Sequence, residues 1–433
     1  MGRIGWIFII IISVVPIILW LTMRPLEMRF TGWYLTMLSI GQLAGLLGYV
    51  FFSISLILSV RLKAFEPFFG GMNKVYIAHH IVGGLAFIFV LLHPLFLAYT
   101  RATISLKEAA LFLLPGQDIA INFGIASLMS MMALLLVTFF IKLKYNIWRF
   151  THQYLGVAFI FSAIHMVLIK SDTSYSPQLY WYLVVVSTMG ISSYLYRSIL
   201  GRWLVRRYDY LVTCVRQLSP LITEITLAPT SRALNFLPGQ FVFVGFDTAS
   251  PIGDEVHPFS ICSPPNTGHL VITAKTLGDY TGKLSSLQPG VKARIEGPYG
   301  RFSYLYHHTP EQIWIAGGIG ITPFISMAGN LITQQNNVKS VTLIYSVRAG
   351  QEAIYLTELA SIQAQLPFFR FILWQTSQYG RLSAKSIEQS SDPLMTKEIF
   401  ICGPQPLMKQ LRSQFVKRGV SNSRIHTEEF TMT

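Results

Sequence analysis

The chain has 433 residues, of which 52% are hydrophobic and 12% are charged, whereas soluble domains contain about 25% charged residues. This composition excludes an ordinary cytosolic enzyme, and the mean hydropathy of +0.47 excludes a disordered chain. Three cysteines are too few for a disulfide-stapled secreted scaffold. The net charge of +14 suits a nucleic-acid binding protein only if the basic residues cluster, so their positions matter.

Charge is sparse in the first half of the chain. Residues 1–200 contain 13 basic and 5 acidic residues, and residues 201–433 contain 21 and 15. Apolar stretches of about 20 residues, the length that crosses a bilayer, recur six times in the first part. These stretches predict a six-helix transmembrane bundle over residues 1–205, with spans near 4–22, 32–60, 75–99, 119–141, 151–169 and 179–200.

Basic residues near the ends of these spans predict their orientation. Eleven Lys and Arg residues flank one side and five flank the other, which places both termini in the cytoplasm by the positive-inside rule. The third and fifth spans then run in the same direction. Arg24, Arg29 and Arg101 fall on the outer side, where an anion could be attracted, but we interpret them as ordinary solvated loop charges.

Histidines are concentrated in the third and fifth spans, as His79, His80, His93, His152 and His165. Ionisable residues at membrane depth are rare and usually functional. His79 and His93 are 14 residues apart, so the second lies on nearly the same helix face as the first, about 21 Å further along the axis. His152 and His165, 13 residues apart, are out of phase by about 140° on an ideal helix, so that span needs a bend, a local π-turn or a supercoil.

We therefore predict two bis-histidine sites at two depths, one of His79 with His152 and one of His93 with His165. His80 is a rival for His79 by spacing. Zinc usually takes four ligands with Cys or carboxylate among them, and residues 1–200 contain no Cys. Two axial imidazoles suit a haem that carries electrons, so we predict two b-type haems, with Gly83, Gly84 and Gly156 leaving room for the macrocycle.

Beyond residue 206 the pattern changes to that of a water-soluble protein. Short apolar runs such as 210–215, 240–244 and 270–274 predict an antiparallel β-barrel over residues 206–308. Runs at 313–316, 341–345, 369–374 and 398–401, with a helix over 323–334, predict a parallel α/β domain over residues 309–433. A glycine-rich turn lies between a strand and that helix, where backbone amides can bind a dinucleotide phosphate.

The motifs in these two domains resemble the ferredoxin–NADP reductase superfamily. The resemblance implies that FAD lies against His257, Pro258, Phe259 and Ser260, with His257 where many members have Arg, and that its pyrophosphate meets the segment from Lys275 to Thr281. It implies an NADPH site, with NADH as the alternative. The residues expected there are Gly317, Gly318, Gly320, Thr322 and Pro323 for the phosphates, Arg348 for a 2′-phosphate, and Cys402, Gly403 and Pro404 beside the nicotinamide.

Over its whole length the chain resembles the NADPH oxidase and ferric reductase superfamily, and within it the bacterial NADPH oxidases. Val75, Tyr76 and His79, Trp148 and Arg149 before His152, and the motifs HPFSI and AGGIGITPFIS carry this resemblance. It implies an integral protein of a bacterial plasma (inner) membrane that is active without an obligate regulatory subunit. Phe430 is expected on the flavin face, where it must move to admit nicotinamide, and Cys402 is expected to position the reactants rather than act as a nucleophile.

The predicted activity is electron transfer from NAD(P)H through FAD and two haems to external dioxygen, which yields superoxide. A ferric-chelate reductase has the same architecture, and an electron donor to a periplasmic partner or a haem-binding structural module are further alternatives. The expected partners are NAD(P)H, dioxygen and membrane lipid, with no nucleic acid. Much of the basic excess on residues 1–200 is then orientation signal on cytoplasmic flanks.

Overall fold

The computed structural model describes residues 2–141, 143, 145–247, 250, 252–253, 255–334, 337–391 and 394–429, without the side chains of residues 145 and 146. The chain forms two compact units. A helical unit contains residues 1–70 and 74–205, and a second unit, built mainly of sheets, contains residues 71–73 and 206–433.

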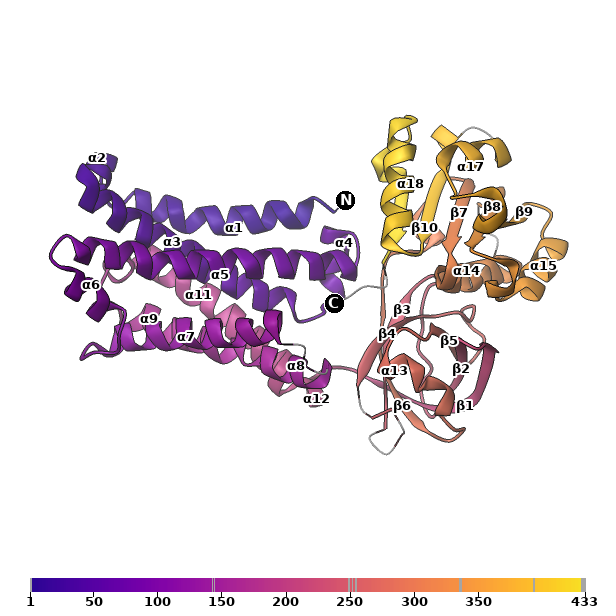
Figure 1. Ribbon diagram of the computed structural model, residues 1–433, viewed down its shortest axis with the longest axis horizontal. Coiled ribbons are helices and arrows are strands. Elements are labelled where there is room, and N and C mark those ends of the chain that lie inside the picture. The colour runs from indigo at the N-terminus through magenta and orange to yellow at the C-terminus, as the bar shows by residue number, and fades with distance from the viewer. Residues whose placement is uncertain are drawn as a thin grey trace. The chain divides into compact units, whose positions relative to one another are not determined.

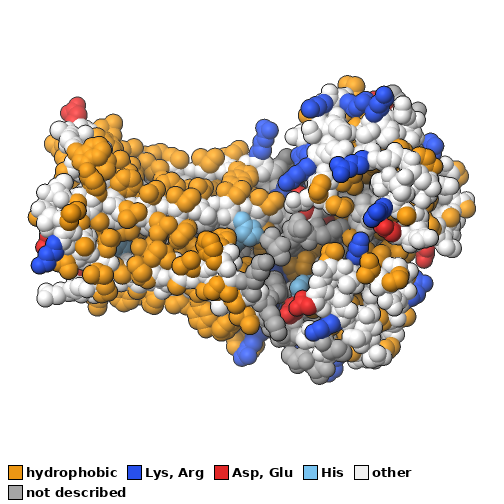
Figure 2. Space-filling view, viewed as in Figure 1, with side chains coloured by type: hydrophobic (Ala, Val, Ile, Leu, Met, Phe, Trp, Pro, Cys, Tyr) orange, Lys and Arg blue, Asp and Glu red, His pale blue; other side chains and the backbone are white. Residues whose placement is uncertain are grey.

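Long helices run side by side along the helical unit, and short helices lie at its two ends (Figure 1). Figure 2 shows apolar side chains covering the visible face of this unit, with Lys and Arg near its ends. The helices are α1 (Ile4–Leu21), α2 (Leu26–Phe30), α3 (Gly32–Leu58), α4 (Glu66–Phe69), α5 (Met72–Ala102), α6 (Leu106–Phe112), α7 (Ile119–Phe140), α8 (Tyr145–Gln153), α9 (Leu155–Leu168), α10 (Asp172–Tyr175), α11 (Pro177–Tyr194) and α12 (Gly201–Leu204).

Five of the described helical segments are long and apolar enough to cross a membrane: α1, α3, α5, α7 and the segment 147–168, which joins α8 to α9. The sixth predicted span forms a helix as well, α11, but its polar residues keep it out of this set. Ser187 hydrogen-bonds Tyr49 of α3, and Ser53 of α3 donates to the Val186 carbonyl at 2.7 Å. The polar groups of α11 are thus used in packing against α3, and the sixth span stays a prediction.

A row of glycines on α3 lets α5 approach closely. A Cβ atom on Gly41 would lie 3.0 Å from Leu97, and one on Gly48 would lie 2.9 Å from the backbone nitrogen of Val90. Small residues four apart serve in this way at helix interfaces in membranes. The glycine row therefore fixes how near α5 comes to α3.

Six antiparallel strands form a barrel-like sheet in the second unit, in the order β4-β3-β6-β1-β2-β5. A bridge between Ile261, which directly follows β4, and Ile272 of β5 brings the two ends of the sheet together. Its interior is a cluster of buried apolar side chains that includes Val242, Leu227 and Ile295. The strands are β1 (Tyr208–Ser219), β2 (Ile222–Pro229), β3 (Phe241–Phe246), β4 (Val256–Ser260), β5 (Leu270–Lys275) and β6 (Lys292–Tyr299).

A five-stranded parallel sheet follows, in the order β11-β10-β7-β8-β9. Alternate residues of β7 point into two different cores. Trp314 packs against α14 and α15 on one face of the sheet, and Ile313 packs against α17 and α18 on the other. Helices therefore cover both faces (Figure 1). The elements are β7 (Glu311–Gly317), α14 (Thr322–Thr333), β8 (Ser340–Val347), α15 (Leu356–Gln365), β9 (Phe369–Gln375), α17 (Ala384–Ser390), β10 (Glu398–Cys402), α18 (Gln405–Lys417) and β11 (Ile425–Glu428).

Candidate functional sites

Four of the intramembrane histidines face each other in two pairs. The ring centroids of His79 on α5 and His152 on α8 are 6.2 Å apart, and those of His93 on α5 and His165 on α9 are 6.4 Å apart. The two pairs therefore lie at different depths along α5, with one partner on α8 and the other on α9.

The out-of-phase spacing of His152 and His165 is resolved by a break in the helix. Tyr154 separates α8 from α9, and its backbone nitrogen bonds the Thr151 carbonyl three residues back instead of the carbonyl four residues back. Such a tightened turn changes the rotation between the two segments. The regular α-helical hydrogen-bond pattern is therefore interrupted at Tyr154, between the two histidines.

Backbone carbonyls orient three of the four rings. His79 donates its Nδ1–H to the Ser55 carbonyl at 2.8 Å, His93 donates to Gly41 at 2.8 Å, and His165 donates to Ala120 at 2.7 Å. A carbonyl can only accept, so Nδ1 carries the proton and Nε2 is left as the available ligand atom. Metal-binding histidines are usually held in this way.

His152 and His80 have different surroundings. Within the described part of the chain, the buried Nδ1 of His152 has no hydrogen-bond partner, and Trp148 stacks on its ring at 5.3 Å. His80 is exposed, and its ring lies 5.5 Å from that of His79. His79, unlike its neighbour His80, has the contact with the Ser55 carbonyl and a ring centroid 6.2 Å from that of His152.

The spacing between the rings fits a six-coordinate iron. A metal–imidazole bond is about 2.0 Å long and the ring centre lies roughly 1.1 Å beyond the nitrogen, so two axial rings are about 6.2 Å apart. Both observed separations match this value. The residues present therefore fit two haems, one held by His79 and His152 and the other by His93 and His165.

Glycines make room for two of the rings. A Cβ atom on Gly45 would lie 2.7 Å from Nδ1 of His93, and one on Gly124 would lie 3.0 Å from Nδ1 of His165. Sequence reasoning missed both, although Gly45 follows Gly41 at the four-residue spacing of close helix contacts.

The three glycines that were expected to make room for the macrocycle have different surroundings. A Cβ on Gly84 would meet nothing within 4 Å, and one on Gly83 would meet the Ser55 hydroxyl at 3.1 Å. The expectation for Gly156 is wrong, because a Cβ there would lie 2.2 Å from the ring of Tyr194. Gly156 admits Tyr194 and leaves no space for a cofactor.

The glycine-rich turn and the Cys-Gly-Pro turn lie side by side in the parallel sheet. The chain builds β7, β8 and β9 outward in one direction and then returns to β10 on the other side of β7, so β7 and β10 flank the point where the strand order reverses. Cofactors bind at the carboxyl ends of strands at such a point. Gly317 ends β7 and Cys402 ends β10.

These two turns pack backbone against backbone. A Cβ on Gly320 would lie 2.2 Å from the Cys402 carbonyl oxygen, and the Cβ of a residue at Gly403 would lie 2.9 Å from Cα of Gly317. Pro323 occupies the first turn of α14, and Thr322 beside it donates its hydroxyl to the Ile319 carbonyl at 3.1 Å. The predicted phosphate-binding residues are thus placed next to the predicted nicotinamide residues.

Cys402 is fully buried at the end of β10. Burial, with a further contribution from the nearby Glu428 carboxylate, raises the pKa of its thiol well above the usual value. A protonated, buried thiol is a poor nucleophile. Pro404 leads into α18, and Arg348 is exposed just beyond β8, at the same edge of the sheet.

The residues predicted to bind the flavin, His257, Pro258, Phe259 and Ser260, lie on strand β4. The imidazole of His257 contacts Glu255 at 3.0 Å and lies against Tyr280, with ring centroids 3.8 Å apart. Phe259 is buried in the barrel core, and Ser260 is buried on the opposite face of the strand from it. Pro258, between His257 and Phe259, is half-buried.

The segment from Lys275 to Thr281 forms a tight turn around Thr281. The Thr281 hydroxyl accepts hydrogen bonds from the backbone of Leu277 at 2.9 Å and Gly278 at 3.2 Å. Two of the amides expected to face a pyrophosphate therefore already have a partner. Lys275 is half-buried at the end of β5, and Phe430 lies outside the described residues.

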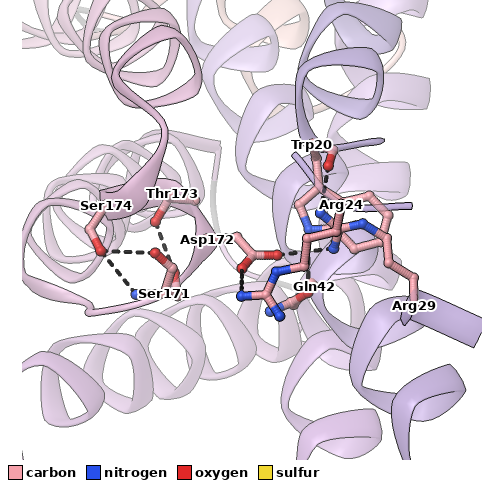
Figure 3. Close-up of polar contacts among 8 residues, drawn as sticks. All are labelled: Trp20, Arg24, Arg29, Gln42, Ser171, Asp172, Thr173 and Ser174. Carbon is pink, nitrogen blue, oxygen red and sulfur yellow. Dashed lines mark hydrogen bonds and ion pairs between the residues drawn. The ribbon is translucent and has the colours of Figure 1, made fainter. Parts of the chain in front are cut away.

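Arg29 is not the solvated loop charge that we expected, because it is 3% exposed and ion-paired. Figure 3 shows Asp172 between two guanidinium groups. The Asp172 carboxylate lies 3.0 Å from Arg29 and 3.1 Å from Arg24, and Arg29 stacks on Trp20 with its Cζ 3.5 Å from the ring centroid. The network ties α1, α2 and α10 together.

Three parts of the chain match known domain families. Residues 44–163 match the ferric reductase like transmembrane component, 213–303 an FAD-binding domain, and 314–413 an oxidoreductase NAD-binding domain. With the long apolar helices, these matches give a ferric-reductase-like membrane domain followed by an FAD-binding domain and an NAD-binding domain. In this order the domains form the architecture of the ferric reductase and NADPH oxidase superfamily.

Individual relatives are more distant. The chain is 26% identical to the reductase subunit of stachydrine N-demethylase from Rhizobium meliloti over 51% of its length, and 29% identical to the glycine betaine monooxygenase reductase subunit from Chromohalobacter salexigens over 46%. It spans 65% and 57% of those proteins. The flavohemoglobin of Malassezia yamatoensis, solved with bound FAD and heme, shares the fold with a TM-score of 0.52 at 17% identity, over 92% of this chain and 97% of that chain.

Proposed function

We propose that the protein is a transmembrane NADPH oxidase that passes electrons from cytosolic NAD(P)H through FAD and two b-type haems to dioxygen on the outer side, where superoxide forms. The observation that carries this proposal is the pair of facing histidine couples, His79 with His152 and His93 with His165, at ring separations that suit axial ligands. Their spacing along α5 divides a bilayer core of about 30 Å into shorter steps.

The residues of the second unit have separate tasks in this proposal. The turn containing Gly317, Gly318 and Gly320 holds the NADPH pyrophosphate at the start of α14, where backbone amides point outward. Cys402 and the following turn position the nicotinamide. When bound, the flavin converts a two-electron hydride into single electrons, and the haems carry those electrons one at a time.

The paired histidines suit the two membrane sites to electron transfer and not to the binding of a further ligand. With an imidazole on each side, an iron at either site has no open position for a ligand. The carbonyl partners of His79, His93 and His165 hold the rings in fixed tautomers. Haems held by His79 with His152 and by His93 with His165 would supply one-electron transfer, and dioxygen would accept its electron without binding to the metal.

The proposal also includes the predicted domains, 1–205, 206–308 and 309–433, and a six-span topology with both termini in the cytoplasm of a bacterium. The proposal keeps the sequence prediction that Phe430, which lies outside the described residues, gates the flavin face. Truncation after Glu429 is expected to raise the rate of hydride transfer, measured as anaerobic flavin bleaching by NADPH.

The activity is tested by NADPH-driven reduction of cytochrome c with the purified protein in detergent. The proposal predicts that superoxide dismutase suppresses this reduction, and that about two superoxide anions form for each NADPH, since a hydride carries two electrons. Reduction that superoxide dismutase leaves unchanged would count against an oxidase. Rapid reduction of a ferric chelate under anaerobic conditions would then favour the ferric-chelate reductase, which has the same architecture.

A further inference from the structure

A second polar cluster lies in the α/β domain, away from the proposed electron path. Nδ1 of His307 and Nε2 of His426 lie 3.1 Å and 3.0 Å from the same carboxylate oxygen, Oε1 of Glu398. One ligand atom from each residue falls within 4.8 Å of the other two. Imidazole and carboxylate are the donor set of many zinc and iron sites.

The carboxylate at the centre of this cluster is incompletely satisfied. The Glu398 side chain is 6% exposed, and its other oxygen, Oε2, is buried without a hydrogen-bond partner among the described residues. A buried carboxylate oxygen without a partner is costly. A cation bound by both oxygens of the Glu398 carboxylate would remove this cost.

The sheet itself fixes the geometry. His426 on β11 pairs with Phe400 on β10, and Glu398 lies two residues before Phe400, on the same face of the sheet. His307 follows a short 3₁₀ turn, and its ring lies against His426 with centroids 3.8 Å apart. The three ligands thus come from two neighbouring strands and one ordered turn.

We propose that His307, Glu398 and His426 bind one divalent transition-metal cation of the zinc class. Metal–ligand bonds of about 2.0–2.2 Å at tetrahedral angles separate neighbouring ligand atoms by about 3.4 Å and the centroids of two bound imidazoles by about 5 Å. The separations of 3.0 Å and 3.1 Å therefore widen slightly on binding, and the two rings, now 3.8 Å apart, part by about 1 Å. Imidazole ligands favour zinc over magnesium or calcium. The two imidazoles, 22% and 19% exposed, give the ion access from solvent.

The position of this site gives it a structural task. Glu398 begins β10 and Cys402 ends it, so the site lies about 13 Å along the strand from the nicotinamide turn. A bound ion joins the edge strand β11 to β10 and to the segment before β7. We expect zinc to stabilise the α/β domain while the KM for NADPH stays unchanged.

The test is equilibrium dialysis of the tag-free full chain against zinc, with the zinc-to-protein ratio measured by elemental mass spectrometry. We expect one zinc per chain, and a loss of affinity of at least about tenfold in His307→Ala and Glu398→Gln, as perturbed metal sites commonly show. His308→Ala and His269→Ala, which change exposed histidines, are the matched controls. X-ray absorption at the zinc edge should show imidazole ligands, with no interference from iron.

Zinc binding that is absent from the wild-type protein, or equal in the wild-type protein, His307→Ala and Glu398→Gln, would overturn the proposal. Loss of zinc from His308→Ala alone would also overturn it. If His307→Ala does not fold, Glu398→Gln carries the test with the same outcomes, because Gln preserves the volume of the buried side chain.

Discussion

The four paired histidines differ in how they are held, and this difference makes each one separately testable. His165→Ala removes an axial ligand of the proposed outer haem, and His152→Ala removes one of the proposed inner haem. We expect each variant to lose about half of the bound haem, since one imidazole holds a haem weakly. The measurement is the haem-to-protein ratio of the purified protein.

His80→Ala is the matched control for these variants, because His80 adjoins His79 and is exposed. It should retain both haems. Full haem content in His165→Ala, or loss of a haem from His80→Ala, would contradict the assignment of the pairs.

The three cysteines are expected to differ in reactivity with iodoacetamide. Burial raises the pKa of the Cys262 thiol to about 12, and burial with the Glu428 carboxylate raises that of Cys402 well above its usual value. Cys214 is exposed. At pH 8 only Cys214 should be alkylated in the folded protein, because the two buried thiols stay protonated until the pH is far higher.

Peptide mass spectrometry measures this pattern, and alkylation in denaturant is the control that all three thiols can react. Rapid labelling of Cys402 in the folded protein would indicate a reactive thiol and would contradict a purely positioning role.

At the scale of elements, the contact between the turns after β7 and β10 has no spare volume. A methyl group on Gly320 would lie 2.2 Å from the Cys402 carbonyl, and overpacking of this kind costs about 1–3 kcal/mol. Gly320→Ala should therefore raise the Kd for NADPH by about tenfold or more. Titration of the purified protein with NADPH under anaerobic conditions gives this value.

Gly116→Ala is the control for the substitution itself, since its Cβ would meet nothing within 4 Å. An unchanged Kd in Gly320→Ala would show that the two turns do not shape the nucleotide site.

The buried ion pair between α2 and α10 is expected to stabilise the helical unit. Asp172→Ala leaves the guanidinium of Arg29, which is 3% exposed, without its carboxylate partner. Breaking a buried pair in this way costs about 3–5 kcal/mol. We expect a clearly lower midpoint of thermal unfolding in detergent, followed by loss of haem absorption.

Arg24 contacts the same carboxylate, but its own side chain is 56% exposed. Arg24→Ala should therefore have little effect on the midpoint of thermal unfolding. Equal destabilisation by Arg24→Ala and Asp172→Ala would mean that burial of the Arg29 pair is not what stabilises these helices.

The sequence predicted elements better than it predicted their contacts. Apolar length and alternation correctly located five membrane helices and the strands at 313–316 and 398–401, because those patterns are local. The tight turn at Tyr154 and the carbonyl partners of the histidines depend on neighbouring helices, and no local pattern reports them. Arg29 was misread for the same reason, since its partner Asp172 is distant in the sequence.

At the scale of the whole molecule, the excess of basic residues is divided between the helical unit and the second unit. The helical unit carries basic residues mainly near the ends of its helices, where Figure 2 shows them on the visible face. Residues 201–433 hold 15 of the 20 acidic residues of the chain. In the proposed oxidase, the second unit delivers electrons from NAD(P)H to the two histidine pairs of the helical unit, which carries them across the bilayer. The proposed oxidase activity depends on that connection.

The most direct test of this connection is the absorption spectrum of the purified protein before and after NADPH is added under anaerobic conditions. We predict the bands of low-spin haem with two imidazole ligands, and their reduction by NADPH only when FAD is bound. A protein without haem, or one in which NADPH reduces the flavin while the haem stays oxidised, would contradict it.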